Sequence, residues 1–289
     1  MSADTSSTAD RARAEAQQTN HEIKRAADNP WVERLMRLGY VARGLIYGAV
    51  GVLALGVAIG AGGQTTDPKG SVALLGRLPG GGPLMAAAAV GLLGYALWCF
   101  VCAVYDPLQR GSGPRGLAKR SAYVFAGIAY LALLAFTTQL LLGGQPGGGS
   151  GPQAIVGKAF ELPGGPVLVG LAGVAAIAGG IGHFVAAWKA RFQRDLRRQE
   201  MNALEREGAL WLGRAGYSAR GVIYVLLGWF VVQAALTHDA SHAQSFGGAF
   251  QALARQPFGH VLLGLVAAGF VALGLHSLAS AVWIRMTVR

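Results

Sequence analysis

Arginine and tyrosine recur with fixed spacing at the edges of apolar segments. GYVARGLIYG begins at Gly39, GYSARGVIYV begins at Gly216, and a more divergent copy, AYVFAGIAYL, begins at Ala122. A guanidinium group binds phosphate through two parallel hydrogen bonds, so the chemistry that this pattern suggests is the binding of an anion. The shared positions are Arg37, Tyr40, Arg43, Gly44 and Tyr47 in the first copy, Arg120, Tyr123, Ala126, Gly127 and Tyr130 in the second, and Arg214, Tyr217, Arg220, Gly221 and Tyr224 in the third.

Spacings of 3, 3, 1 and 3 residues place the five positions of each copy on one face of a helix. Arg43 and Arg220 fall in the first turns of their apolar segments, where the helix dipole disfavours a cation and the free amides attract an anion. The pattern predicts a basic rim that holds anionic lipid headgroups or another phosphorylated ligand. The candidates are Arg37, Tyr40, Arg43, Tyr47, Arg120, Tyr123, Arg214, Tyr217, Arg220 and Tyr224. The alternative is that Arg43 and Arg220 extend to the membrane interface and serve only to orient the chain.

Two thiols and two imidazoles form a second, weaker set. Cys99 and Cys102 share a helical face, and His183 and His276 fall at nearly equivalent positions of two later apolar segments. Buried thiols and imidazoles can bind a metal, and two histidines can hold a haem. The alternative is that the cysteines are small packing residues and that each histidine bonds to a neighbouring polar group. We expect no cofactor.

Other chemistry is sparsely represented. His238, Asp239 and His242, with His260 further along, could bind a metal if their segment were helical. The sequence has neither a GxxxxGK[ST] phosphate loop nor an HExxH motif, and no serine–histidine–carboxylate set lies in the apolar segments. We therefore expect a protein that is not an enzyme.

Six apolar segments are long enough to cross a bilayer, which takes about 20 residues. We predict spans at about 39–60, 83–105, 121–142, 166–188, 216–237 and 259–284. The outer connections contain weakly amphipathic pieces that begin at Ser71, Ala154 and Ala249, for which short surface helices are expected. The Glu-containing segment 189–215 is expected to form another short surface helix.

Charge predicts the orientation of these spans. Only Lys69, Arg77, Lys158 and Arg255 lie in the first, third and fifth connections, and the other 21 of the 25 basic residues lie on the opposite side. By the positive-inside rule, both termini are expected in the cytoplasm. The net charge of +11 is explained by this distribution, so the expected partner is the bilayer, including anionic lipids, and not nucleic acid.

The spans form a threefold internal repeat. The tyrosines Tyr40, Tyr123 and Tyr217 are 83 and 94 residues apart, and glycines that open the even spans repeat with the same two intervals. Each unit is a helical hairpin that begins and ends on the same side, so the units are parallel. The expected organisation is a disordered cytoplasmic tail over 1–29, hairpins over 30–110 and 111–193, and a basic linker with the third hairpin over 194–289.

Three copies of an RxxYxARGxxY-type hairpin, over most of residues 34–286, resemble the domain-of-unknown-function 1206 family of bacterial membrane proteins. The resemblance implies six spans built from tandem two-span repeats in the plasma membrane of a bacterium, and it implies no activity. The predicted fold is therefore an all-helical membrane protein of three parallel hairpins with pseudo-threefold arrangement. The predicted function is that of a structural or accessory membrane protein. The alternative is an uncoupled transporter or channel for a small or anionic solute along the pseudo-threefold axis.

Overall fold

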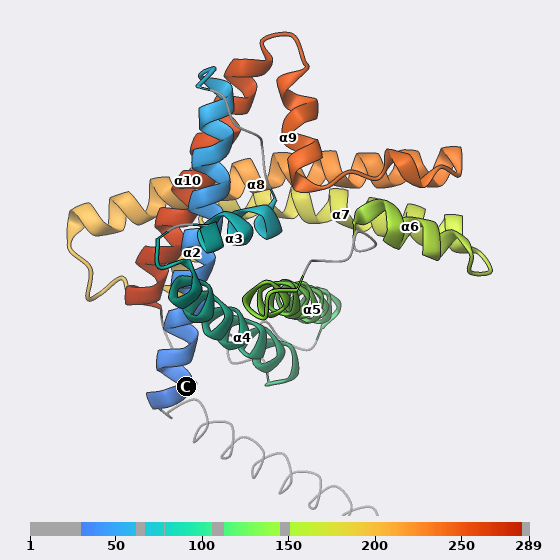
Figure 1. Ribbon diagram of the computed structural model, residues 1–289. Helices are drawn as coiled ribbons and strands as arrows, with labels where there is room; N and C mark the ends of the chain where they lie inside the picture. The colour runs from blue at the N-terminus through green and yellow to red at the C-terminus, as the bar shows by residue number, and fades with distance from the viewer. Residues whose placement is uncertain (1–29, 62–66, 78, 106–112, 145–150, 285–289) are drawn as a thin grey trace, which may run out of the picture.

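Six long helices dominate the computed structural model, which describes residues 30–61, 67–77, 79–105, 113–144 and 151–284 (Figure 1). All six are long and apolar enough to cross a membrane, which confirms the predicted spans. They are α2 (Pro30–Ala58), α4 (Gly81–Tyr105), α5 (Pro114–Leu141), α7 (Gly165–Trp188), α8 (Ala203–Thr237) and α10 (Gly259–Trp283). The expected N-terminal tail lies outside the described residues.

Local sequence fixes where these helices begin. Pro114 opens α5, where a missing backbone N–H costs nothing. At α8, the Asn202 side chain accepts from the Glu205 amide and the Glu205 side chain accepts from the Asn202 amide. This capping box starts α8 at Ala203, well before the predicted start near residue 216. The expected separate surface helix is therefore wrong: Glu205 and Glu207 belong to the beginning of α8, and Glu200 lies in a turn between α8 and the 3₁₀ turn η1 (Arg191–Asp195).

The three outer connections each contain a short helix, as the amphipathic pieces predicted. These helices are α3 (Pro68–Arg77), α6 (Pro152–Phe160) and α9 (Phe246–Ala254), and a 3₁₀ turn, η2 (Ala240–His242), precedes α9. Each short helix buries part of its apolar face: Val72, Val156 and Phe250 are almost completely shielded from solvent. The short helices thereby pack against the long helices.

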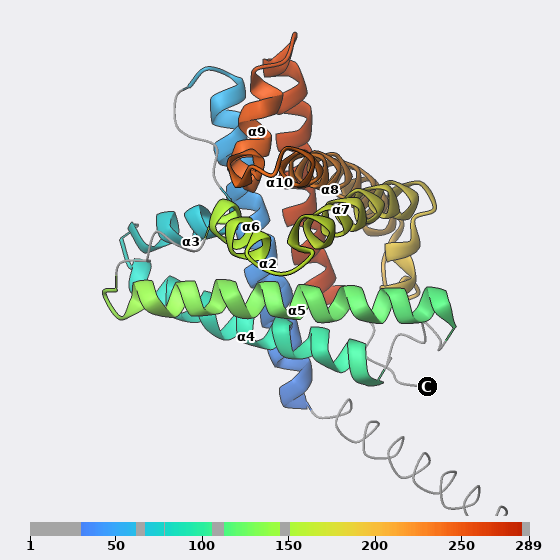
Figure 2. The ribbon, with the colours of Figure 1, turned by 90° about the vertical axis from the view of Figure 1, so that its right-hand side faces the viewer.

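The long helices pack most closely in three antiparallel pairs, and each pair joins two different repeats. The pairs are α2 with α10, α4 with α5, and α7 with α8. Figures 1 and 2 show that the three pairs run in three clearly different directions around a common centre. This cyclic exchange of partners confirms a pseudo-threefold arrangement of three hairpin repeats.

The repeated glycine lies where the members of each pair approach closely. A Cβ on Gly44 would lie 3.0 Å from the Gly274 carbonyl oxygen, and one on Gly221 would lie 3.0 Å from that of Gly180. A Cβ on the equivalent Gly127 would lie 3.0 Å from the ring of Phe100. Small residues let helix backbones approach in membranes, so this glycine sets the geometry of all three pairs.

The threefold arrangement is broken in the second repeat. Within the first repeat α2 packs against α4, and within the third α8 packs against α10, but α5 and α7 hardly touch. As a result, only 17% of the most apolar window of each of these two helices is buried inside the protein, against 33–56% for the other four. The second hairpin is therefore open on one side.

Candidate anion site

The centre of the molecule contains two arginines from different repeats. Arg43 of α2 and Arg220 of α8 both contact the ring of Tyr47: their guanidinium carbons are 5.6 and 5.3 Å from its centroid. Arg220 is also 5.2 Å from the ring of Tyr224, one turn further along its own helix. The spacing of arginine and tyrosine by four residues thus creates a helical cation–π pair in each of these repeats.

The hydrogen bonds of the two guanidinium groups are incomplete. Arg43 donates from Nη1 to the Tyr95 hydroxyl at 2.5 Å, and Arg220 donates from Nη2 to the Tyr224 hydroxyl at 3.1 Å. Both Nε atoms are buried without a hydrogen-bond partner among the described residues. Arg43 is 8% exposed, so its side chain is buried within the protein. Each group therefore retains donors for a further acceptor.

Two tyrosines, one on α4 and one on α5, complete the surroundings of the two arginines. Tyr130 of α5 lies edge-on to Tyr95 of α4 with ring centroids 4.6 Å apart, and its hydroxyl is 3.5 Å from that of Tyr47. All three repeats thus contribute to one cluster, which we call the central cluster: Arg43, Tyr47, Tyr95, Tyr130, Arg220 and Tyr224.

The central cluster carries positive charge without a compensating carboxylate. The membrane segments around it, residues 36–58, 81–105, 114–141, 165–188, 210–237 and 259–283, contain no Asp or Glu. The position equivalent to Arg43 in the second repeat is Ala126, so two of the three possible guanidinium groups are present. A buried cation with free donors and no acidic partner is suited to hold an anion.

Aromatic side chains pack on both sides of this charged layer. One side is covered by Phe270, whose ring lies 5.9 Å from Tyr47, and by Phe246, whose ring lies 6.1 Å from Tyr224. On the other side, one helical turn earlier, Tyr40 packs edge-on to Tyr95, and Tyr217 stacks on Phe192 at 5.1 Å. Aromatic rings therefore flank the two arginines on both sides.

The outer arginines of the motif have different contacts. Arg37 donates to the carbonyls of Ala281 and Val282, at the end of α10. Arg120 donates to the carbonyls of Ala103 and Val104, at the end of α4. Each satisfies the last carbonyls of its antiparallel partner and places a cation at the negative end of the helix dipole.

The third copy does not repeat this contact, because Arg214 lies over the Trp211 ring at 5.3 Å. Tyr123 packs in a separate group with Met36, Trp98 and Cys102. The predicted rim therefore divides in two: Arg43, Arg220 and their tyrosines face the centre, whereas Arg37 and Arg120 join helix ends.

The thiols and imidazoles do not gather into one group. Cys99 and Cys102 are buried on α4. His183 packs beside Tyr224 at 5.2 Å and beside Tyr217 at 5.7 Å, while His276 packs edge-on to Phe192 at 4.9 Å. Within the described ranges, no three His, Cys, Asp or Glu side chains are placed to bind a metal ion together.

The outer histidine segment likewise has a local role. Asp239 accepts from the Ser241 amide at 2.8 Å, which lowers the pKa of its carboxyl group, and lies 3.6 Å from the His242 imidazole. His238 packs near Phe160 instead. Asp239 thus caps the turn η2, and the described residues here do not form a metal-binding group.

Two residues of the central cluster are absent from the sequence-based candidates. Tyr130 aligns with Tyr47 and Tyr224, so the repeat itself indicates it as a candidate. Tyr95 has no tyrosine at the equivalent positions of the other repeats. The available signal was a phenol hydroxyl in the middle of an otherwise aliphatic span, since such a group needs a polar partner inside the membrane.

The fold and the site define a multi-pass helical membrane protein built from three tandem hairpin repeats. The family model described as Domain of Unknown Function (DUF1206) matches residues 38–106, 121–190 and 215–283, so the chain belongs to that family. An uncharacterized protein of Bacillus subtilis (strain 168), YxxB, is 32% identical over 258 residues, which cover 89% of this chain and 93% of the relative. No solved structure matches the chain.

Proposed function

We propose that this protein binds an anion of the phosphate class inside the membrane, at Arg43 and Arg220, in a structural or accessory role. One observation carries the proposal: Arg43, which is buried, and Arg220, which is partly buried, contact the same tyrosine ring, have no acidic partner among the described residues, and each retain a buried, unbonded Nε–H. The chain acts in the plasma membrane with both termini in the cytoplasm.

The energetics favour a bound anion. Burial of an uncompensated ion costs several kcal/mol, and two cations beside one ring also repel each other. A cation–π contact returns only about 0.5–2 kcal/mol, so the tyrosines compensate in part. An anion between the guanidinium groups would remove the repulsion and accept from the free donors.

The shape of the site favours binding over chemistry or conduction. Phenols are weakly acidic donors that complement guanidinium groups around an oxyanion, and aromatic rings enclose the layer on both sides. The phosphate group belongs either to a soluble ion or to a lipid headgroup.

Thermal unfolding of the purified, delipidated protein in a neutral detergent tests this proposal. Inorganic phosphate should raise the unfolding temperature, because a ligand at 100 times its Kd stabilises by about 2.7 kcal/mol. Phosphatidylglycerol added in mixed micelles, against phosphatidylcholine, forms the second arm. Stabilisation by phosphate alone identifies a soluble ion, and stabilisation by phosphatidylglycerol alone identifies a lipid headgroup.

The variant Arg43→Gln with Arg220→Gln should lose the stabilisation, and Arg255→Gln, an exposed residue of the opposite end, should keep it. Equal stabilisation of the double variant and the original chain would show that the anion binds elsewhere. If the double variant does not fold, Arg220→Lys, which retains charge without the planar fork, should weaken phosphate binding and allow the same comparison.

Passage of an anion along the pseudo-threefold axis is the second candidate. It is supported by the central position of the two arginines. A path for an anion through the helix bundle would pass the centre, whereas arginines at the edge of the bundle would not lie on it. Efflux of phosphate from vesicles containing the protein would favour this candidate, provided that Arg43→Gln abolishes the efflux.

A further inference from the structure

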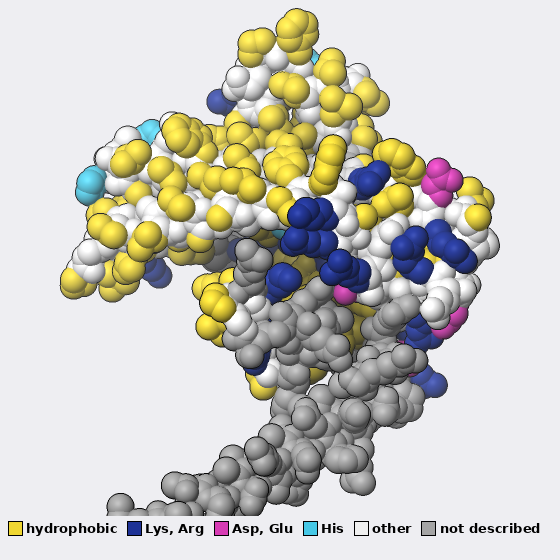
Figure 3. Space-filling view, turned by 180° about the vertical axis from the view of Figure 1, so that it is seen from behind, with side chains coloured by type: hydrophobic (Ala, Val, Ile, Leu, Met, Phe, Trp, Pro, Cys, Tyr) yellow, Lys and Arg dark blue, Asp and Glu magenta, His cyan; other side chains and the backbone are white. Residues whose placement is uncertain are grey.

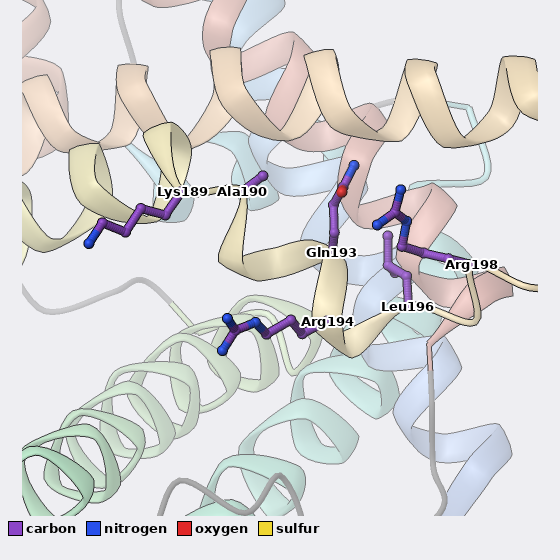
Figure 4. Close-up of a pocket in the computed structure, with 6 residues that line it drawn as sticks. All are labelled: Lys189, Ala190, Gln193, Arg194, Leu196 and Arg198. Carbon is purple, nitrogen blue, oxygen red and sulfur yellow. The ribbon is translucent and has the colours of Figure 1, made fainter.

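A second basic feature lies apart from the central cluster, where α7 ends. A hollow of 370 Å³ is formed by the segment that joins the second and third repeats. Its lining residues are Lys189, Ala190, Gln193, Arg194, Leu196 and Arg198 (Figure 4). Seen from behind, Lys and Arg side chains gather in one region of the molecular surface, while much of the remaining described surface is apolar (Figure 3).

The segment that forms the hollow is firmly held. Phe192 is buried against Tyr217 and His276, and its ring occupies the space beside Gly213. The Arg197 amide donates to the Trp283 carbonyl at 2.7 Å, and Leu196 forms an antiparallel bridge with Ile284. The basic side chains therefore extend from a fixed backbone.

Arg197 of this segment has acidic partners, whereas the basic residues that line the hollow have none among the described residues. Arg197 lies 3.8 Å from Glu33 and 3.7 Å from Glu200. Lys189, Arg194 and Arg198 are exposed and have no ion pair within the described part of the chain. Three cations around one hollow thus remain available to an anion.

The hollow adjoins the open side of the second hairpin. Lys189 caps the end of α7, and in Figure 4 Arg194 extends from η1 on the side where α5 lies. Both α5 and α7, which hardly touch each other, carry uncovered apolar side chains: Phe125 and Ile128 on α5 and Val174 and Ile181 on α7 are all more than half exposed.

We infer that an anionic phospholipid binds at the second hairpin, with its headgroup on Lys189, Arg194 and Arg198 and its acyl chains along the open faces of α5 and α7. A phospholipid matches both parts of this surface, because its phosphate complements the three cations and its chains complement the apolar helices. This site is separate from the central cluster and does not depend on it.

Native mass spectrometry of the full-length protein with added phosphatidylglycerol tests the inference. The original chain should retain phosphatidylglycerol in preference to phosphatidylcholine. Arg194→Gln with Arg198→Gln should reduce the retention by about fivefold for each residue, since a basic residue near a membrane surface is worth about 1 kcal/mol. Both residues are exposed, so the variant should fold.

A matched control removes the same charge nearby, at η1 and in the first turns of α8. Arg191→Gln with Arg206→Gln changes two exposed arginines that do not line the hollow, and should leave retention unchanged. An equal loss in the two double variants would mean general attraction to charge and would overturn the inference. Displacement of the lipid by soluble glycerol phosphate would also overturn it, because the acyl chains would then contribute nothing.

The two sites can be tested independently. Arg43→Gln with Arg220→Gln should retain the lipid at the hollow while losing stabilisation at the central cluster. Loss of the lipid in that variant, with retention in Arg194→Gln and Arg198→Gln, would instead place the lipid at the centre and refute a headgroup site on the linker.

Discussion

At the scale of single residues, the motif joins a guanidinium group to a phenol four residues later. In the first and third repeats the pairs Arg43–Tyr47 and Arg220–Tyr224 form on one helix, and Arg220 adds a contact with Tyr47 of another repeat. Where the second repeat has Ala126, its tyrosine remains and contacts Tyr95 and Tyr47 instead. All three repeats therefore retain the tyrosine of this pair. The ring of one of them, Tyr47, contacts guanidinium groups from two repeats.

Tyr95→Phe should destabilise the protein more than Tyr130→Phe. The Tyr95 hydroxyl accepts a hydrogen bond from a buried charged group, and the loss of such a bond costs about 1.5–3 kcal/mol. Tyr130 is a matched control, because its hydroxyl reaches only Tyr47, at a distance of 3.5 Å. Thermal unfolding in detergent measures the difference. Equal loss in the two variants would mean that Arg43 obtains its stabilisation from other groups.

At the scale of helices, the repeated glycine determines which elements meet. Gly44 has Leu278 and the Gly274 carbonyl within 3.0 Å of an added Cβ, whereas an added Cβ on Gly48 of the same helix has no neighbour within 4 Å. The first position is thus a contact between α2 and α10, and the second has room for a methyl group.

Gly44→Ala should therefore separate α2 from α10 and destabilise the protein by about 1–3 kcal/mol, the usual cost of overpacking. Gly48→Ala should be neutral or slightly stabilising, because alanine favours a helix over glycine by about 1 kcal/mol. Chemical denaturation of the two variants in parallel checks this order. The reverse order would show that the close approach of α2 and α10 is not what holds the pair.

The sequence predicted the six helices because hydropathy and length determine spans locally, and it predicted the repeat from the equal intervals. It did not predict that the closest pairs join different repeats, such as α2 with α10. Glycines such as Gly44 and Gly274 indicate a close approach but do not identify the partner, since all the spans contain small residues. The burial of Arg43 also could not be predicted from the sequence, because its position near the start of a span is compatible with extension to the interface as well.

At the scale of the whole molecule, two departures from threefold symmetry, one in sequence and one in helix packing, occur in the same repeat. The second repeat has Ala126 in place of the central arginine, and its two long helices hardly touch, whereas α2 with α4 and α8 with α10 are packed. A fully symmetric molecule would have three central guanidinium groups and three equally packed hairpins. This protein has two such groups and one hairpin whose long helices hardly touch. A third buried cation would increase repulsion at the centre, so we expect the number of arginines there to be limited by the charge that a bound anion can compensate.

Ala126→Arg tests this relation between symmetry and charge. Without a bound anion, a third guanidinium group should destabilise the protein, because buried like charges repel. With inorganic phosphate present, the same variant should recover stability and should show a larger phosphate-dependent rise in unfolding temperature than the original chain. Ala126→Met, similar in length but uncharged, controls for volume and should show the original response. A phosphate response in Ala126→Arg no larger than that of Ala126→Met would place position 126 outside the electrostatic reach of the site. The central charge would then be set by the first and third repeats alone.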